Sequence, residues 1–188
     1  MKLTFANLAA LSALAVGGGL LAVRAVADEP AVAADAKAPN FSAKGSDGKT
    51  HTLASLTKDG PIVLYFISSS CPTNAEAVKY YNRVGTAYGS KVRMVGVINE
   101  DAAGYKTWAK EFKPTYPVLY DKDMKIIRAY KAEASPWAVS VANGEIAKTW
   151  DGYSTSYLTE LNASVAKAGK VATKKIDLKG TPSDPAFG

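Results

Sequence analysis

The sequence contains a single cysteine, Cys71, in a setting that favours reactivity. It follows three serines at positions 68 to 70 and precedes Pro72, a residue favoured at the first position of a helix. Cys71 is therefore expected at or next to the N-cap. There, unpaired backbone N–H groups and the positive end of the helix dipole favour a thiolate over a thiol. The alternative is a small buried hydrophobe that ends a strand. We predict a nucleophile.

Other chemistry is limited by one cysteine and one histidine, His51. A lone cysteine excludes an intramolecular disulfide and every multi-cysteine zinc or iron–sulfur site, so we expect no cofactor and no metal. His51 lies just after the Asp47-Gly48 turn, where an exposed strand position is expected rather than a ligand. The net charge of +6 is too small an excess for a dense nucleic-acid-binding surface, so no nucleic-acid partner is expected.

The elements that must position Cys71 alternate between strands and helices. Residues 61–67 are a continuous apolar run, typical of a central strand covered on both faces. Residues 73–88 carry apolar side chains at helical spacing. Beyond them we expect strands at 91–97 and 116–120, a helix capped by Asp101, a hairpin around Asn143-Gly144 and a final helix capped by Thr155. Residues 123–131 fit either a helix or an extended segment.

This alternation predicts an α/β domain whose central mixed sheet is flanked by helices. The parallel strands form the core of the sheet, and antiparallel strands finish its edge. A small N-terminal hairpin is expected within residues 41–56, around Asp47-Gly48. Ligands of α/β proteins bind at the carboxyl ends of parallel strands, which is where Cys71 is expected.

The first 27 residues have the features of a signal peptide. Lys2 precedes an apolar stretch, and Ala25-Val26-Ala27 has the small-x-small form that signal peptidase accepts. An uncleaved membrane anchor is the alternative, since residues 5–23 are just long enough to span a bilayer. Cleavage predicts an exported protein, periplasmic or secreted, whereas contact with a membrane is expected only if the leader stays.

The rest of the chain divides into three parts. We expect a flexible leader at 28–37, one domain at 38–169 and a polar, solvated tail at 170–188.

Five segments of the chain follow one another in a recognisable order: Ala38-Pro39-Asn40-Phe41, Asp47-Gly48-Lys49, Ile62 to Phe66 before Cys71-Pro72, Tyr116 to Asp121, and Ser135-Pro136. Together they resemble the redoxin group of the thioredoxin-like superfamily. That group holds the alkyl hydroperoxide reductase/thiol-specific antioxidant proteins and exported thiol–disulfide oxidoreductases. The resemblance runs from about Ala38 to Ala168 and implies a thioredoxin-like fold with an added N-terminal hairpin.

The resemblance also implies a substrate-binding loop. Ser135-Pro136 is similar to the group's cis-proline loop, which would bring the Ser135 backbone against Cys71 and offer an extended substrate a strand edge. Pro72 and Trp137 would line the same site. The alternatives are an ordinary proline at a strand entry and a core tryptophan.

The sequence departs from both mechanisms of the group. Asn74 stands where a C-x-x-C motif has its second cysteine, so release of a mixed disulfide needs an outside thiol. Ser68 fits the hydroxyl three residues before a peroxidatic cysteine, but Leu64 replaces the upstream proline. The expected loop arginine is also missing, which leaves three other arginines as candidates: Arg83, Arg93 and Arg128.

Two classes of function remain. The first is an exported thiol-dependent oxidoreductase that uses Cys71 for hydroperoxide reduction through a sulfenic acid or for monothiol disulfide exchange. Its partners would be an external thiol reductant, a protein thiol substrate or a hydroperoxide. The second is a catalytically inactive thioredoxin-like binding or structural domain. A disulfide-linked homodimer through Cys71 is a smaller alternative.

Overall fold

The structure is a computed structural model and describes residues 36–188. The expected signal peptide and nearly all of the expected leader lie outside the described residues. Within residues 36–188, no helix is long and apolar enough to cross a membrane.

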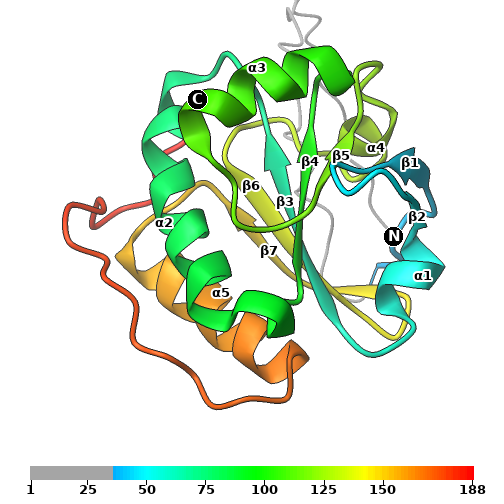
Figure 1. The fold of residues 1–188 in the computed structure, drawn as a ribbon. Helices are drawn as coiled ribbons and strands as arrows, with labels where there is room; N and C mark the ends of the chain where they lie inside the picture. Colours follow the sequence, from blue (N-terminus) through cyan, green and yellow to red (C-terminus); the bar gives the residue numbers. More distant parts are fainter. Residues whose placement is uncertain (1–35) are drawn as a thin grey trace, which may run out of the picture.

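A five-stranded mixed sheet forms the centre of the molecule (Figure 1). Its order is β5-β4-β3-β6-β7, in which β3, β4 and β5 are parallel and β6 and β7 are antiparallel to their neighbours. The predicted mixed sheet with antiparallel edge strands is thereby confirmed. The strands are β3 (Ile62–Ile67), β4 (Met94–Ile98), β5 (Val118–Tyr120), β6 (Trp137–Ala142) and β7 (Glu145–Asp151).

Helices cover both faces of this sheet, which is why every residue of β3 is buried. One face of β3 packs into a cluster with α2, α3 and α5, and the other face packs with α1 and α4. The helices are α1 (Leu53–Thr57), α2 (Pro72–Tyr88), α3 (Ala102–Phe112), α4 (Lys125–Ala129) and α5 (Thr155–Ala168), with a short 3-10 turn, η1 (Gly89–Lys91), after α2.

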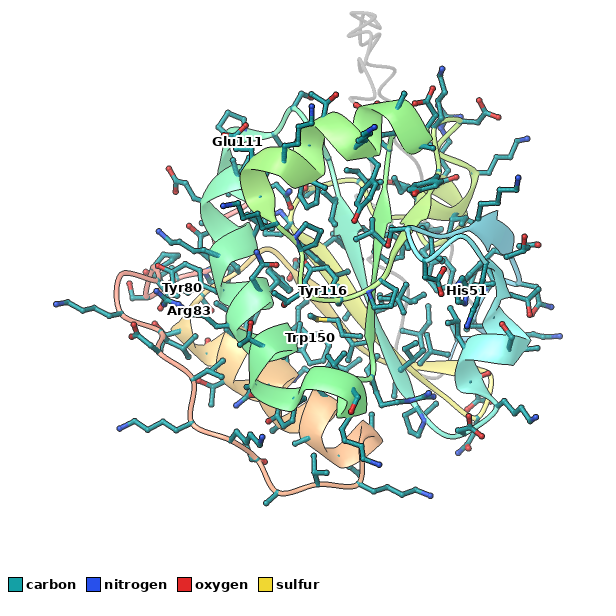
Figure 2. All side chains as sticks on the ribbon, viewed as in Figure 1. His51, Tyr80, Arg83, Glu111, Tyr116 and Trp150 are labelled. Atoms are coloured by element: carbon teal, nitrogen blue, oxygen red, sulfur yellow. The ribbon has the colours of Figure 1, made fainter. Side chains whose placement is uncertain are left out.

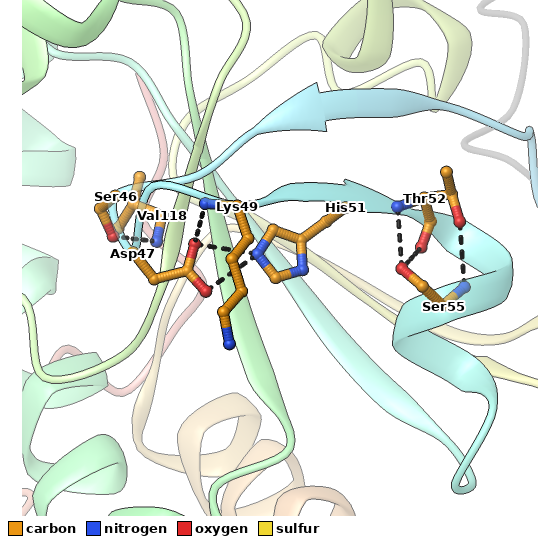
Figure 3. A network of polar contacts seen from close by, with 7 residues as sticks. All are labelled: Ser46, Asp47, Lys49, His51, Thr52, Ser55 and Val118. Carbon is orange, nitrogen blue, oxygen red and sulfur yellow. Dashed lines mark hydrogen bonds and ion pairs between the residues drawn. The ribbon is translucent and has the colours of Figure 1, made fainter.

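A separate two-stranded hairpin, β1 (Ser42–Lys44) and β2 (Thr50–Thr52), confirms the predicted N-terminal addition. Its turn is tied to β5, because the Ser46 hydroxyl accepts a bond of 3.0 Å from the Val118 N–H (Figure 3). His51 lies on a strand, as predicted, but its ring is half-buried rather than exposed and lies 3.0 Å from the Asp47 carboxylate. The hydrogen bond from His51 lowers the pKa of Asp47 below its ordinary value.

Two helix starts show how far local signals hold. Asp101 caps α3 as predicted, accepting bonds from the N–H groups of Ala103 and Gly104. The last helix begins one residue earlier than expected, because the Ser154 hydroxyl, rather than that of Thr155, accepts the N–H of a first-turn residue. The ambiguous segment 123–131 contains the short helix α4.

Most residues of the expected solvated tail after α5 are exposed, and the segment is held against the domain. The segment lies along α5 and α2 (Figure 1). The side chains of Ile176 and Leu178 pack against the core. The buried Asn162 amide donates a bond of 2.8 Å to the Lys174 carbonyl. The tail has few apolar groups, but side chains of the helices bind its backbone, which its composition does not reveal.

Candidate active site

Cys71 is the N-cap residue of α2, in the short connection that leads from β3 into the helix. Its sulfur accepts the backbone N–H of Asn74 at 3.4 Å, and its own N–H donates to the Ser68 carbonyl at 3.3 Å. The side chain is half-buried and free of any disulfide. The local sequence dictates this placement, because the apolar strand ends at the serines and Pro72 starts the helix.

The loop before β6 closes over the sulfur from the other side. The Ser135–Pro136 peptide bond is cis, as predicted. The Cys71 thiol lies 3.4 Å from the Ser135 carbonyl oxygen, to which it donates. The Ser135 hydroxyl also accepts the Ser68 N–H at 3.2 Å. The structure therefore brings together four of the predicted site residues: Ser68, Cys71, Ser135 and Pro136.

A buried pair of polar side chains lies behind Cys71. The Tyr65 hydroxyl donates a bond of 2.6 Å to the Asn74 side-chain oxygen, and both residues are buried. Burial raises the pKa of Tyr65 well above its ordinary range, so the phenol stays a neutral donor. Its ring stacks on Tyr81 at a centroid distance of 3.7 Å. Sequence analysis missed Tyr65, although it is the one polar side chain in the apolar run.

The serine loop before Cys71 is held from the neighbouring strand. The Ser69 N–H donates to the Asn99 side-chain oxygen at 2.9 Å, and its hydroxyl donates to Glu100 at 2.6 Å. Asn99 and Glu100 follow β4, which is parallel to β3, so their chain positions place them at the same sheet edge. In the sequence these two residues directly precede Asp101, for which only a helix cap is predicted.

A cavity of about 140 Å³ opens between the end of β3 and the loop before Pro136. Its walls are mostly apolar, and two of its polar residues, Ser68 and Ser135, contact Cys71. The lining residues are Phe66, Ile67, Ser68, Asn99, Met124, Ile127, Ala132, Glu133, Ala134, Ser135 and Gly188.

The remaining predicted site residues have different positions. Pro72 is exposed on the first turn of α2. Trp137 does not line the cavity: it is 6% exposed and packs in the core with Val139 and Val141. The alternation of β6 explains this, because residues two apart point to the same face of the sheet. The alternative of a core tryptophan is the correct one.

The three arginines are engaged away from the sulfur. Arg83 pairs with Asp177, Arg93 donates to backbone carbonyls that include Gly60, and Arg128 donates to the Asp123 carbonyl. Within residues 36–188, no group of three metal-ligating side chains is assembled. The chemistry that these residues offer is that of one thiol between a helix start and a backbone carbonyl.

The sheet order, the helix-start cysteine and the cis-proline loop define a thioredoxin-like redoxin domain. The AhpC/TSA family matches residues 34–154, and the chain belongs to that family. Thus the family resemblance stated from the sequence is confirmed.

Among curated proteins, the chain is 30% identical over 96 residues to the chloroplastic peroxiredoxin Q of Triticum aestivum. The match covers 47% of this chain and 41% of that protein. A second chloroplastic peroxiredoxin Q, from Populus jackii, is 29% identical over 51% of this chain and 46% of its own length. The chain therefore spans less than half the length of these relatives.

Solved structures support the fold. The thioredoxin domain of a thiol-disulfide oxidoreductase from Bacteroides vulgatus superposes with a TM-score of 0.60 at 18% identity, covering 71% of this chain and 99% of that one. A secreted disulfide oxidoreductase of Mycobacterium tuberculosis, homologous to E. coli DsbE, superposes with a TM-score of 0.56 at 23% identity. This superposition covers 68% of this chain and 95% of that one.

Proposed function

We propose that this chain is an exported monothiol oxidoreductase that exchanges disulfides of extended polypeptides with an external thiol through Cys71. The observation that carries the proposal is the contact of the Cys71 thiol with the Ser135 carbonyl, 3.4 Å away. It sets the nucleophile beside a loop whose backbone can pair with an extended chain, and such pairing is a common mode of peptide recognition.

The exchange proceeds in three attacks. The Cys71 thiolate attacks a peptide sulfur in a peptide–glutathione disulfide, which forms a Cys71–peptide disulfide and expels glutathione thiolate. A glutathione thiolate then attacks the Cys71 sulfur and expels the peptide thiolate, which takes a proton from solvent. A second glutathione thiolate frees Cys71 and leaves oxidised glutathione. Overall, one peptide disulfide and one glutathione give a peptide thiol and oxidised glutathione.

Groups at the start of α2 stabilise and position the Cys71 sulfur during these steps. The Asn74 N–H, which already bonds the sulfur at 3.4 Å, stabilises it whenever it carries negative charge. The side chain of Asn74 is held by Tyr65, so the first turn of α2 keeps its position. With asparagine at this position, the chain supplies no second thiol, which is why an outside thiol must complete the cycle.

Hydroperoxide reduction is the second candidate, and the peroxiredoxin Q relatives favour it. In that reaction the Cys71 thiolate attacks the peroxide oxygen, becoming a sulfenic acid and expelling water or an alcohol. The Ser68 hydroxyl would assist. The engagement of the three arginines elsewhere argues against it, since none of them is available at the sulfur to hold the peroxide.

The proposed location outside the cytoplasm rests on the signal-like first 27 residues. The secreted character of the similar Mycobacterium tuberculosis protein supports it. The third possibility, an inactive binding domain, predicts a Cys71 that does not turn over.

The test is glutathione-dependent reduction of a peptide–glutathione disulfide by wild type, Cys71→Ser and Ser68→Ala. The rate of reduction with wild type should exceed the rate with glutathione alone. The rate with Cys71→Ser should equal that of glutathione alone, and the rate with Ser68→Ala should stay close to that of wild type. An unaccelerated wild-type reaction would overturn the proposal. Faster consumption of hydrogen peroxide than of the peptide disulfide, lost in Ser68→Ala, would establish the second candidate instead.

A further inference from the structure

The tail after α5 follows a defined course over the molecule (Figure 1). It passes along the outer side of α2, where Arg83 pairs with Asp177 and the Tyr80 hydroxyl donates a bond of 3.2 Å to the Lys179 carbonyl. The Arg83 guanidinium also lies 5.1 Å from the centre of the Tyr80 ring, and Figure 2 shows both side chains beside the tail. These contacts direct the last residues toward the start of α2.

The end of the tail makes two pairs of backbone hydrogen bonds with the domain. Ala186 exchanges two backbone bonds with Tyr153, at 2.9 and 3.0 Å. Two residues further on, Gly188 exchanges two with Ser135, at 2.9 and 3.0 Å. Each exchange has the two-bond form of an antiparallel pair, and the two partners lie in different segments: Tyr153 follows β7, whereas Ser135 precedes β6. Residues 186–188 thus occupy the backbone edge that the proposed function assigns to an extended substrate.

Gly188 stands directly over the nucleophile. A Cβ placed on it would lie 3.3 Å from the Cys71 sulfur and 2.9 Å from the Thr73 hydroxyl, which a small rotation of Thr73 relieves. In a disulfide, the Cβ of one cysteine lies about 3 Å from the sulfur of the other, because the S–S bond is only about 2.05 Å long. A cysteine at this position would therefore be placed for a bond to Cys71.

We propose that residues 186–188 are a built-in pseudosubstrate, meaning a segment that binds as a substrate does but cannot react. The inference rests on the proposed function and deepens it. The substrate it implies is an extended polypeptide whose cysteine replaces Gly188 and whose backbone pairs with Ser135. Because glycine has no sulfur, the tail occupies the backbone edge at Ser135 without forming a disulfide with Cys71. A protein substrate must therefore displace the tail.

The cavity beside Gly188 favours substrates that carry an apolar side chain next to the reacting cysteine. Its walls include Phe66, Met124 and Ile127, whereas the Phe187 side chain is 60% exposed and leaves the cavity to other groups. A substrate with an apolar side chain next to its cysteine can bury that side chain there, which stabilises binding in proportion to the apolar area removed from water.

The position of the tail is tested by Gly188→Cys, with Phe187→Cys as the matched control. Oxidised glutathione serves as the oxidant: two protein thiols become one disulfide, and two glutathione thiols are released. Gly188→Cys should close an intramolecular disulfide with Cys71 at least ~10-fold faster than the control, because only its sulfur is held near Cys71. Equal rates, measured by intact mass and thiol alkylation, would overturn the placement.

The effect on substrate access is tested by deleting residues 186–188, with Phe187→Ala as the control that keeps the backbone pairing. Deletion should speed the reaction of Cys71 with a peptide disulfide about tenfold, because the tail no longer has to leave the backbone edge first. The rate of the reaction of Cys71 with hydrogen peroxide, a small oxidant, should rise far less. The control should match wild type. Equal peptide rates with and without the segment would overturn the pseudosubstrate and leave the proposed function standing. No reaction of Cys71 in either protein would overturn both.

Discussion

The hydrogen bond between Tyr65 and Asn74 makes a contribution to stability that can be measured by removing one hydroxyl. In Tyr65→Phe the ring keeps its stacking on Tyr81, at 3.7 Å, but the Asn74 side-chain oxygen loses its donor at 2.6 Å. Both residues are buried, so water does not replace the lost partner. Leaving a buried acceptor unpaired costs about 1–3 kcal/mol.

The assay is urea unfolding of the full chain, followed by tyrosine and tryptophan fluorescence. With a slope of about 2 kcal/mol per molar urea, the midpoint of Tyr65→Phe should fall by about 0.5–1.5 M. The slope itself should not change, because the variant exposes the same surface on unfolding.

Tyr116→Phe is the matched control. Tyr116 is also buried, and its hydroxyl has no hydrogen-bond partner among the described residues. Removing a hydroxyl that has no partner should leave the free energy of unfolding unchanged or raise it. An unchanged midpoint in Tyr65→Phe, or an equal fall in both variants, would refute the argument that the bond to Asn74 stabilises the helix start.

Two further predictions concern the starts of α2 and α3. Asn74→Cys supplies a second thiol on the first turn of α2. In the presence of oxidised glutathione it should form a disulfide with Cys71, measured as protection of both thiols from alkylation. Two free thiols would contradict the placement of residue 74 beside the Cys71 sulfur. For Asp101, bonds from the Gly104 N–H and then from Lys122 lower the pKa to about 2 from 3.8. The folded state therefore gains stability from the charged form above pH 3.8 and loses it as the pH falls through about 2. Wild type should be more resistant to urea than Asp101→Asn at pH 7, and the difference should shrink at the acid end; a constant difference would contradict the assignment.

Local signals were enough to predict most of the fold and the centre of the site. The continuous apolar run before the serines predicted a strand covered on both faces, and Pro72 predicted the helix start that makes Cys71 an N-cap. The cis-proline loop followed from the family resemblance rather than from any local pattern.

The parts that sequence did not reveal depend on backbone groups meeting across the chain. The tail is polar, but Tyr80 and Asn162 bind its carbonyl groups, and no side-chain pattern predicts such bonds. The pairing of Gly188 with Ser135 is of the same kind. Trp137 was predicted to line the site for a different reason, namely that it follows Pro136 in the sequence. The two-residue alternation of β6 instead points its side chain into the core.

The most direct test of disulfide exchange is the identity of the first product formed at Cys71. The full chain is mixed with equal concentrations of a peptide–glutathione disulfide and hydrogen peroxide, quenched with acid, and the mass added at Cys71 is measured. Disulfide exchange predicts that a peptide or glutathione adduct appears before any added oxygen. Addition of oxygen alone, or no change at Cys71, would contradict it.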